Sequence, residues 1–230
     1  MKTRMYDTAV SEKGFTLVEL AVVMVIIGLL IGGILKGQEM IANAQVNSTI
    51  AQIRAVDAAT STFRDIYDAF PGDMLNPQAR LPNCTAAPCN VAGDGDSRLE
   101  VLPLGTAGTE ETGFFEHLEA ADLLAGINNA SFLDADINGN EMRPGFTTGA
   151  AALGALANPL QGHYISIVQS GTDAAPGLES IDAARIDRKL DDGDPATGSV
   201  GGNAATCGTG GAYLEANPGL ICASIVRIQG

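Results

Sequence analysis

Glu19 carries the clearest chemical constraint in the chain, because it is a single carboxylate near the start of an apolar run. Residues 15–35 contain no other charged side chain. A carboxylate inside a membrane is costly unless it is paired or protonated, and such residues usually have a function. Glu19 is therefore expected to need a partner. The alternative is that it lies at the membrane surface and reaches water.

A second candidate chemistry is calcium binding. Asp134, Asp136 and Asn138, followed by Gly139, match the first half of a calcium loop in which alternating oxygens converge on the ion. The second half of that pattern fails, because Gly145 stands where a bidentate glutamate is needed. The three oxygen-bearing residues remain the leading candidates for a calcium site.

Two other acidic loops are weaker candidates for the same cation. Each places aspartates around a glycine: Asp94 and Asp96 around Gly95, and Asp191, Asp192 and Asp194 around Gly193. Asp, Asn and Gly are also the residues that form turns, so turn formation is the competing interpretation for all three loops.

The four cysteines are expected to form disulfides rather than a metal site. Of the three possible pairings we favour Cys84–Cys89, which closes a short loop containing proline, and Cys207–Cys222, which links a glycine-rich loop to the last strand. A four-cysteine zinc site would prefer two short cysteine pairs, and only one is present.

Catalysis has little support in the sequence. The two histidines, His117 in an expected helix and His163 at an expected strand start, lie in no recognisable nucleophile or metal pattern. No aspartate spacing singles out a hydrolytic pair. We therefore expect a protein that is not an enzyme, with no certain cofactor.

The element that positions Glu19 is an apolar helix. At about 1.5 Å per residue, a helix over residues 15–35 covers the roughly 30 Å hydrocarbon core of a bilayer. A cleaved secretory signal is the alternative, but the run is longer than a usual signal core, and Lys36, Gly37, Gln38 and Glu39 supply no small-residue cleavage site. We predict a single transmembrane helix.

The segment from Lys13 through Gly14 and Phe15 to Glu19 resembles the leader of the type IV pilin and type II secretion pseudopilin superfamily. The resemblance implies that a prepilin peptidase cuts between Gly14 and Phe15 and that Phe15 becomes N-methylated. It also implies that Glu19, the fifth mature residue, pairs with the Phe15 ammonium of an adjacent subunit. Such pairing would link charge neutralisation to assembly and register.

Three later segments also resemble recurring stretches of pilin-like proteins, and their individual roles are not readable from the sequence. They are residues 70–74, 111–118 and 186–193. One departure is Lys36, which occupies a position where major pilins commonly have proline. Glycines at 28, 32, 33 and 37 are expected to allow close helix approach or local weakening instead.

The charges of the chain predict its orientation in the membrane and disfavour nucleic acids as partners. The leader carries Lys2, Arg4 and Lys13, and positive charge before a span favours a cytoplasmic leader with the rest translocated. The chain has a net charge of −14, so general nucleic-acid binding is disfavoured. The basic cluster Arg185, Arg188 and Lys189 is surrounded by aspartates and indicates a solvated face.

The helix is expected to continue past the membrane to about Phe70, because no proline occurs before Pro71-Gly72-Asp73. We further expect a helix from about Glu110 to Leu124 ending at Gly126, a strand over 163–169, a helix over 178–190 and a strand over 220–228. The class is α+β. The resemblance implies a pilin-like fold, in which the amphipathic half of the long helix packs on an antiparallel sheet.

The expected organisation is a prepilin leader over residues 1–14, a transmembrane assembly helix over 15–36, an amphipathic helix over 37–70 and an extracytoplasmic head over 71–230. The resemblance implies a subunit of a type IV pilus or secretion pseudopilus at the bacterial inner membrane, with other subunits and an inner-membrane assembly platform as partners. The alternatives are an anchored ligand-binding domain that does not polymerise and an anchored hydrolase.

Overall fold

The structure is a computed structural model. It describes residues 14–100, 109–128, 131–148, 161–170, 175–202, 207–209, 211–216, 219 and 221–228. The chain divides into two compact units, Met1–Asn43 and Ala44–Gly230. The second unit is called the head below. The leader residues of the sequence prediction before Gly14 lie outside the described residues.

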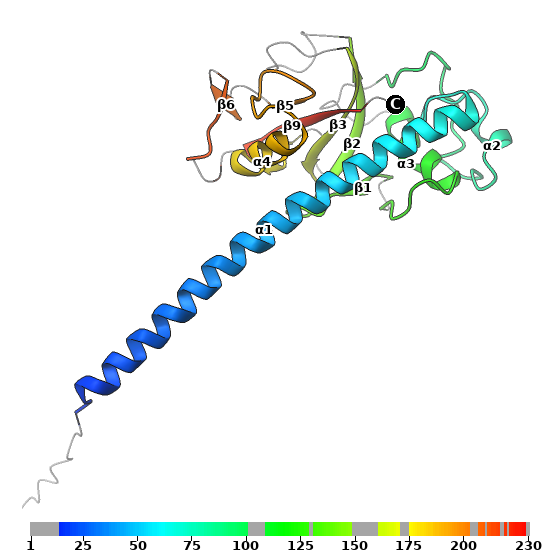
Figure 1. Cartoon of the computed structure of the whole chain (residues 1–230). Helices are drawn as coiled ribbons and strands as arrows, with labels where there is room; N and C mark the ends of the chain where they lie inside the picture. The colour runs from blue at the N-terminus through cyan, green and yellow to red at the C-terminus, as the bar shows by residue number, and fades with distance from the viewer. Residues whose placement is uncertain are drawn as a thin grey trace, which may run out of the picture. The chain divides into compact units, whose positions relative to one another are not determined.

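One long helix, α1 (Leu17–Tyr67, 51 residues), confirms the expectation of a helix that does not stop at residue 36 (Figure 1). It ends three residues before the predicted Phe70. Asp68 adopts a left-handed conformation with φ 47°, and its N–H still bonds to the Arg64 carbonyl at 2.8 Å. This is the usual way a helix is terminated at its carboxyl end.

Within the head, α1 buries one face. Its buried side chains recur every three or four residues, as expected for an amphipathic helix: Val46, Thr49, Ile50, Ile53, Val56, Ala59, Thr60 and Phe63. The apolar members of this face belong to the same core as buried sheet residues such as Met142, Ile165 and Ile167. The amphipathic half of α1 therefore packs on the sheet side of the head, as the pilin-like fold implied.

The main sheet has five antiparallel strands in the order β1-β2-β3-β9-β5. Its strands are β1 (Leu133–Asp134), β2 (Asn140–Thr147), β3 (Gly162–Gln169), β9 (Ser224–Ile228) and β5 (Val200–Gly202). In the register, Asn140 lies opposite Gln169 and His163 lies opposite Ile228. The predicted α+β class and the antiparallel sheet are confirmed.

Three strands of this sheet, β1, β2 and β5, were not predicted by the sequence analysis. β2 contains Pro144 and Gly145, which normally break strands, and β5 contains two glycines. Pro144 lies opposite Ile165 of β3, whereas the described part of β1 pairs only with Glu141 and Met142, so the proline has a strand neighbour on one side only. The last predicted strand is divided into β8 (Ile221–Cys222) and β9.

Three shorter helices complete the head: α2 (Pro77–Arg80), α3 (Thr109–Ala120) and α4 (Ser180–Leu190). α3 ends before the predicted Leu124. The Leu123 N–H reaches the Leu118 carbonyl and the Asp122 N–H reaches that of Glu119, with Asp122 at φ 54°. This is a Schellman termination in which aspartate takes the position that glycine usually occupies.

Two small two-stranded sheets lie outside the main sheet. β4 (Leu178–Glu179) pairs with β8, and β6 (Gly208–Thr209) pairs with β7 (Ala212–Tyr213). β4 occupies the first two residues of the helix predicted over 178–190, so α4 begins only at Ser180. The pairing with β8 outweighs the helical pattern at those two residues.

Candidate functional site

The start of α1 is held by a reciprocal cap between Thr16 and Glu19. The Thr16 N–H and hydroxyl donate to Glu19 Oε2 at 2.9 and 2.8 Å, and the Glu19 N–H donates to Thr16 Oγ1 at 3.2 Å. This is a capping box, which satisfies N–H groups that the first helical turn leaves without partners. The cap residue Thr16 lies two residues after Gly14, so α1 begins at Leu17, and the Glu19 carboxylate turns back toward this start.

The apolar half of α1 has no packing partner within the described chain. Phe15 is 86 % exposed and Leu17 is 89 % exposed. The most apolar window of the helix has a mean hydropathy of 2.7 and none of it is buried, so the helix is long and apolar enough to cross a membrane. Such a surface requires lipid or other protein subunits to cover it.

Small residues interrupt this apolar surface. A Cβ added at any of the glycines at 28, 32, 33 and 37 would meet no described atom within 4 Å. The glycines are therefore not required by contacts within the chain. Lys36 and Glu39 follow the run and form an exposed ion pair at 2.7 Å. They mark the end of the apolar segment.

Comparison with protein families gives one match, and it falls on this segment. Residues 10–35 match the prokaryotic N-terminal methylation motif. The chain carries the prepilin signature of type IV pilins and pseudopilins. No curated protein and no solved structure was found to match the chain.

The prepilin signature contains Gly14, Phe15 and Glu19, which the sequence analysis selected. Thr16 was not selected, although its signal was present, because Thr-x-x-Glu before an apolar run is the sequence pattern of a capping box. The roles of Gly14 and Phe15 in cleavage and methylation stay predictions. The motif and the apolar helix together fit a prepilin-type protein anchored in a membrane.

The leading calcium candidate forms a hairpin turn between β1 and β2. Asn138 and Gly139 have consecutive positive φ values of 55° and 65°, and the Asn140 N–H bonds to the Ile137 carbonyl at 3.2 Å. Asparagine followed by glycine is the preferred sequence for such a turn. The turn interpretation thus accounts for the residues that suggested half of a calcium loop.

The two aspartates of that loop contact α1 and a neighbouring side chain. Asp136 accepts a hydrogen bond from the Ser48 hydroxyl, and Asp134 Oδ1 accepts one from Asn128 Nδ2 at 2.7 Å. The amide of Gln52 bonds to the Asp134 carbonyl and to the Asp136 N–H. These contacts fasten the hairpin to α1, and calcium at this loop stays a prediction.

The loop with Asp94 and Asp96 is organised by two buried carboxylates from elsewhere. Asp73 accepts the N–H groups of Gly95 and Ser97, each at 2.6 Å. Glu110, at the start of α3, accepts the Glu100 N–H at 2.9 Å. Burial and the charges of Asp73 and Glu100 raise the pKa of Glu110 to about 7.

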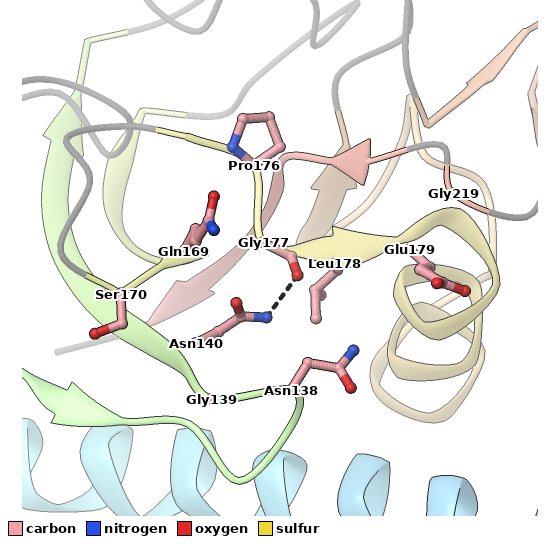
Figure 2. A pocket seen from close by; sticks show the side chains of 10 residues that line it. All are labelled: Asn138, Gly139, Asn140, Gln169, Ser170, Pro176, Gly177, Leu178, Glu179 and Gly219. Carbon is pink, nitrogen blue, oxygen red and sulfur yellow. Dashed lines mark hydrogen bonds between the residues drawn. The ribbon is translucent and has the colours of Figure 1, made fainter.

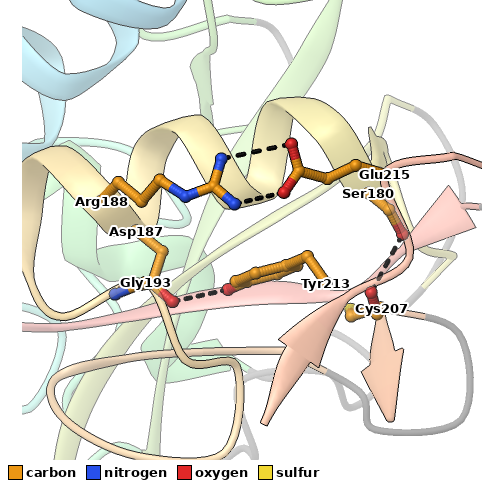
Figure 3. A network of polar contacts seen from close by, with 7 residues as sticks. All are labelled: Ser180, Asp187, Arg188, Gly193, Cys207, Tyr213 and Glu215. Atoms are coloured by element: carbon orange, nitrogen blue, oxygen red, sulfur yellow. Dashed lines mark hydrogen bonds and ion pairs between the residues drawn. The ribbon is translucent and has the colours of Figure 1, made fainter.

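The third acidic loop follows α4, and contacts of the buried Asp187 in α4 help to organise it (Figure 3). Asp187 is fully buried, accepts the Tyr213 hydroxyl at 2.8 Å and accepts the Gly193 N–H at 3.1 Å. Burial raises the pKa of Asp187 to about 6. The adjacent Arg188 pairs with Glu215, so two successive residues of α4 hold the segment that Cys207 and Cys222 enclose.

The histidines are structural. His117 is fully buried, accepts the Gly72 N–H at Nδ1 at 2.9 Å and lies 2.8 Å from the Cys89 carbonyl through Nε2. Burial lowers the pKa of His117 below its ordinary value. His163 stacks on Phe70 with ring centroids 3.7 Å apart. Neither ring is paired with a nucleophile among the described residues.

His117 also explains two of the recurring segments. Residues 70–74 and 111–118 meet where the Gly72 N–H reaches His117, and a Cβ on Gly72 would lie 2.3 Å from the Glu110 carbonyl. The third segment, 186–193, contains the Asp187–Gly193 contact. All three segments therefore make contacts that shape the head.

Both predicted disulfides are present. Cys84–Cys89 has a Cα separation of 5.3 Å and Cys207–Cys222 one of 4.7 Å. All four cysteines are at least 95 % buried. The sulfurs of the first pair lie near His117, but as a disulfide they are not thiolate ligands.

Proposed function

We propose that the chain is a structural subunit of a type IV pilus or a type II secretion pseudopilus. It is made as a prepilin, cut between Gly14 and Phe15 by a prepilin peptidase, methylated at Phe15 and polymerised through α1. Its partners are the peptidase, other pilin or pseudopilin subunits and an inner-membrane assembly platform. The head remains on the extracytoplasmic side.

The observation that carries this proposal is the unpacked apolar half of α1, which bears the prepilin signature and has Glu19 as its only charge. Leu29, Leu30 and Leu35 are each at least 60 % exposed within the chain. In a membrane, lipid covers such a helix, and in a filament the helices of neighbouring subunits replace lipid. The same apolar surface can therefore contact lipid in the membrane-anchored subunit before assembly and contact other subunits in the filament.

Glu19 supplies the register of that packing. In a free subunit, the Thr16 cap satisfies Oε2 of Glu19, and no group among the described residues bonds to Oε1. After cleavage, the Phe15 ammonium of a neighbour can approach this second oxygen. A subunit in the wrong register leaves both charges unpaired in an apolar setting, which is strongly unfavourable.

Assembly can be tested by expressing the chain with a prepilin peptidase and a pilus or pseudopilus assembly system. Sheared filaments would be quantified for the native chain, Glu19→Ala and Glu19→Gln. We expect both variants to be cleaved and to yield at least tenfold fewer filaments, because neither provides a carboxylate. Native filament yield from both variants would contradict the proposal and favour an anchored domain that does not polymerise.

A further inference from the structure

The head contains a hollow of about 460 Å³ (Figure 2). It lies where β2 begins and β3 ends, beside the segment that leads into β4. Its volume falls within the range of small-molecule sites in proteins, about 300–1,000 Å³. The chemistry of its lining can therefore be compared with that of a ligand.

The lining is polar and almost uncharged. Its side chains include three amides, one hydroxyl and one carboxylate: Asn138, Asn140, Gln169, Ser170 and Glu179. Pro176 and Leu178 are the only large apolar residues among the described residues of the lining, and Leu178 is fully buried. The ten residues that line it include no lysine, arginine, histidine or aromatic residue.

Parts of this lining are held in place before any ligand arrives. Asn140 is 4 % exposed, and its Nδ2 donates to the Gly177 carbonyl at 2.6 Å. That contact fixes the amide plane, and Figure 2 shows its oxygen on the side away from the bond. A Cβ on Gly177 would lie 2.8 Å from Asn140 Cγ, so only glycine permits this approach. A fixed lining lowers the ordering cost of binding.

Two ligand classes fit poorly. An anion would find no cation among the described lining residues, would face Glu179 and would approach a chain with a net charge of −14. An apolar ligand would find two large apolar residues and no aromatic face. Amides both donate and accept hydrogen bonds, and a carboxylate accepts two, which matches neighbouring hydroxyl groups on one molecule.

We propose that this hollow binds a neutral, hydroxyl-rich ligand, a saccharide unit. A peptide fits less well, because the main chain around the hollow is already paired: Gly177 with Asn140, Gln169 with Ala175, and β4 with β8. A peptide that adds to a sheet needs free main-chain groups. Here side chains, rather than a strand edge, are offered to the ligand.

A single site of this kind is expected to be weak, with a Kd of about 1 mM or above, because few apolar contacts support it. Repetition along a filament would raise the avidity of such a site for a surface that carries many copies of the saccharide. The gain in avidity rests on the proposed function, because it requires a filament, whereas saccharide binding by one subunit does not.

The test is ligand-observed NMR on the full chain in lauryldimethylamine oxide, a detergent that carries no sugar. The probes are maltose, cellobiose, lactose and N,N′-diacetylchitobiose, with glucuronic acid as the anionic comparison, each titrated to about 10 mM, where a millimolar site is mostly filled. Asn138→Gly removes one lining amide and keeps the left-handed turn, and Glu179→Gln removes the carboxylate. Gln78→Ala, an amide in a different hollow, is the matched control.

We expect saturable binding of at least one neutral disaccharide, at least tenfold weaker binding of glucuronic acid, and a loss of threefold or more in each lining variant but not in Gln78→Ala. Unchanged thermal unfolding would show that the variants fold. No saturation by any probe, equal binding by the lining variants, or preferential binding of a glycine-serine hexapeptide would overturn the proposal. Since the subunit is unassembled in this experiment, either result is independent of filament formation.

Discussion

Residues 17–35 and residues 46–63 belong to one unbroken helix, yet the apolar side chains of the first segment are exposed and those of the second are buried. In the second segment, Val46, Val56 and Phe63 are fully buried. In the first, apolar residues as large as Leu29 remain 74 % exposed. Helical pattern alone therefore does not define a core. The buried segment is held by its own head, whereas the exposed one is complete only with lipid or other subunits.

Matched truncations test this comparison with the largest expected effect. Phe63→Ala should lower the free energy of unfolding of the head by about 3–5 kcal/mol, because it leaves a cavity in a close-packed core. Leu29→Ala should leave it unchanged, since its side chain touches little of the chain. Thermal and denaturant unfolding of the full chain in detergent would measure both. A comparable loss in Leu29→Ala would show that the first segment packs on the head.

Glycine-to-alanine changes should change stability in opposite directions in the two regions. A Cβ at Gly202 would lie 2.7 Å from Cys207 Sγ, whereas one at Gly32 would meet nothing within 4 Å. We expect Gly202→Ala to destabilise the head by about 1–3 kcal/mol through overpacking. Gly32→Ala should instead favour the helix by roughly 0.5–1 kcal/mol. The midpoint of unfolding and the helical circular dichroism signal report the two effects, and equal behaviour of the two variants would contradict this account.

Part of the pH dependence of stability should originate in the head at Glu110, and Asp187, whose pKa burial also raises, should act in the same direction. The folded state raises the pKa of Glu110 to about 7 from its ordinary value of 4.5. The folded protein therefore binds the proton more tightly, and this contribution to stability is greatest below pH 4.5 and is lost as the pH rises through about 7. His117, whose pKa is lowered, acts in the opposite direction as the pH falls.

Comparison with Glu110→Gln separates these two effects, because only Glu110 differs. The stability of the native chain relative to Glu110→Gln should fall between about pH 5 and pH 8. Denaturant titrations at several pH values would measure the difference. A constant difference would show that Glu110 does not bind its proton more tightly in the folded state than in the unfolded state.

A further small effect is expected at the start of the exposed segment. Thr16→Val removes the hydroxyl that bonds to Glu19 and should weaken the first turn of α1 by about 1 kcal/mol. Thr16→Ser should retain the cap. Amide hydrogen exchange of residues 17–20 would show faster exchange in the valine variant alone, with unchanged exchange in the head. Equal exchange in all three chains would mean that the capping box adds nothing to helix stability.

The elements that were predictable from the sequence have strong local signals. The long helix lacks a breaker, β3 is rich in β-branched and aromatic residues, and each cysteine pair is close in sequence. β2 was missed because Pro144 and Gly145 oppose strand formation locally. Its pairing with β3 along the full length of both strands supplies the stabilisation, and such pairing is not visible in a single segment.

The candidate site residues also differ in whether a local sequence signal identifies them. Glu19 stands out as one charge in an apolar run, which is a local signal. The aspartates of the three acidic loops have no such distinguishing signal, because turns and calcium loops use the same residues. In the first two loops the organising contacts also come from distant positions: Ser48 reaches Asp136, and Asp73 reaches Gly95 and Ser97. The hollow beside Asn140 likewise combines segments that are far apart in the chain.

The most direct test of the central claim is the intact mass of the native chain extracted from membranes that contain a prepilin peptidase, beside Gly14→Ala. Loss of residues 1–14 with the addition of one methyl group, together with retention of the leader in Gly14→Ala, is the result that we predict. An uncleaved native chain, or one cut after the apolar run, would contradict it, because the exposed half of α1 would then be a plain anchor or a signal sequence rather than an assembly helix.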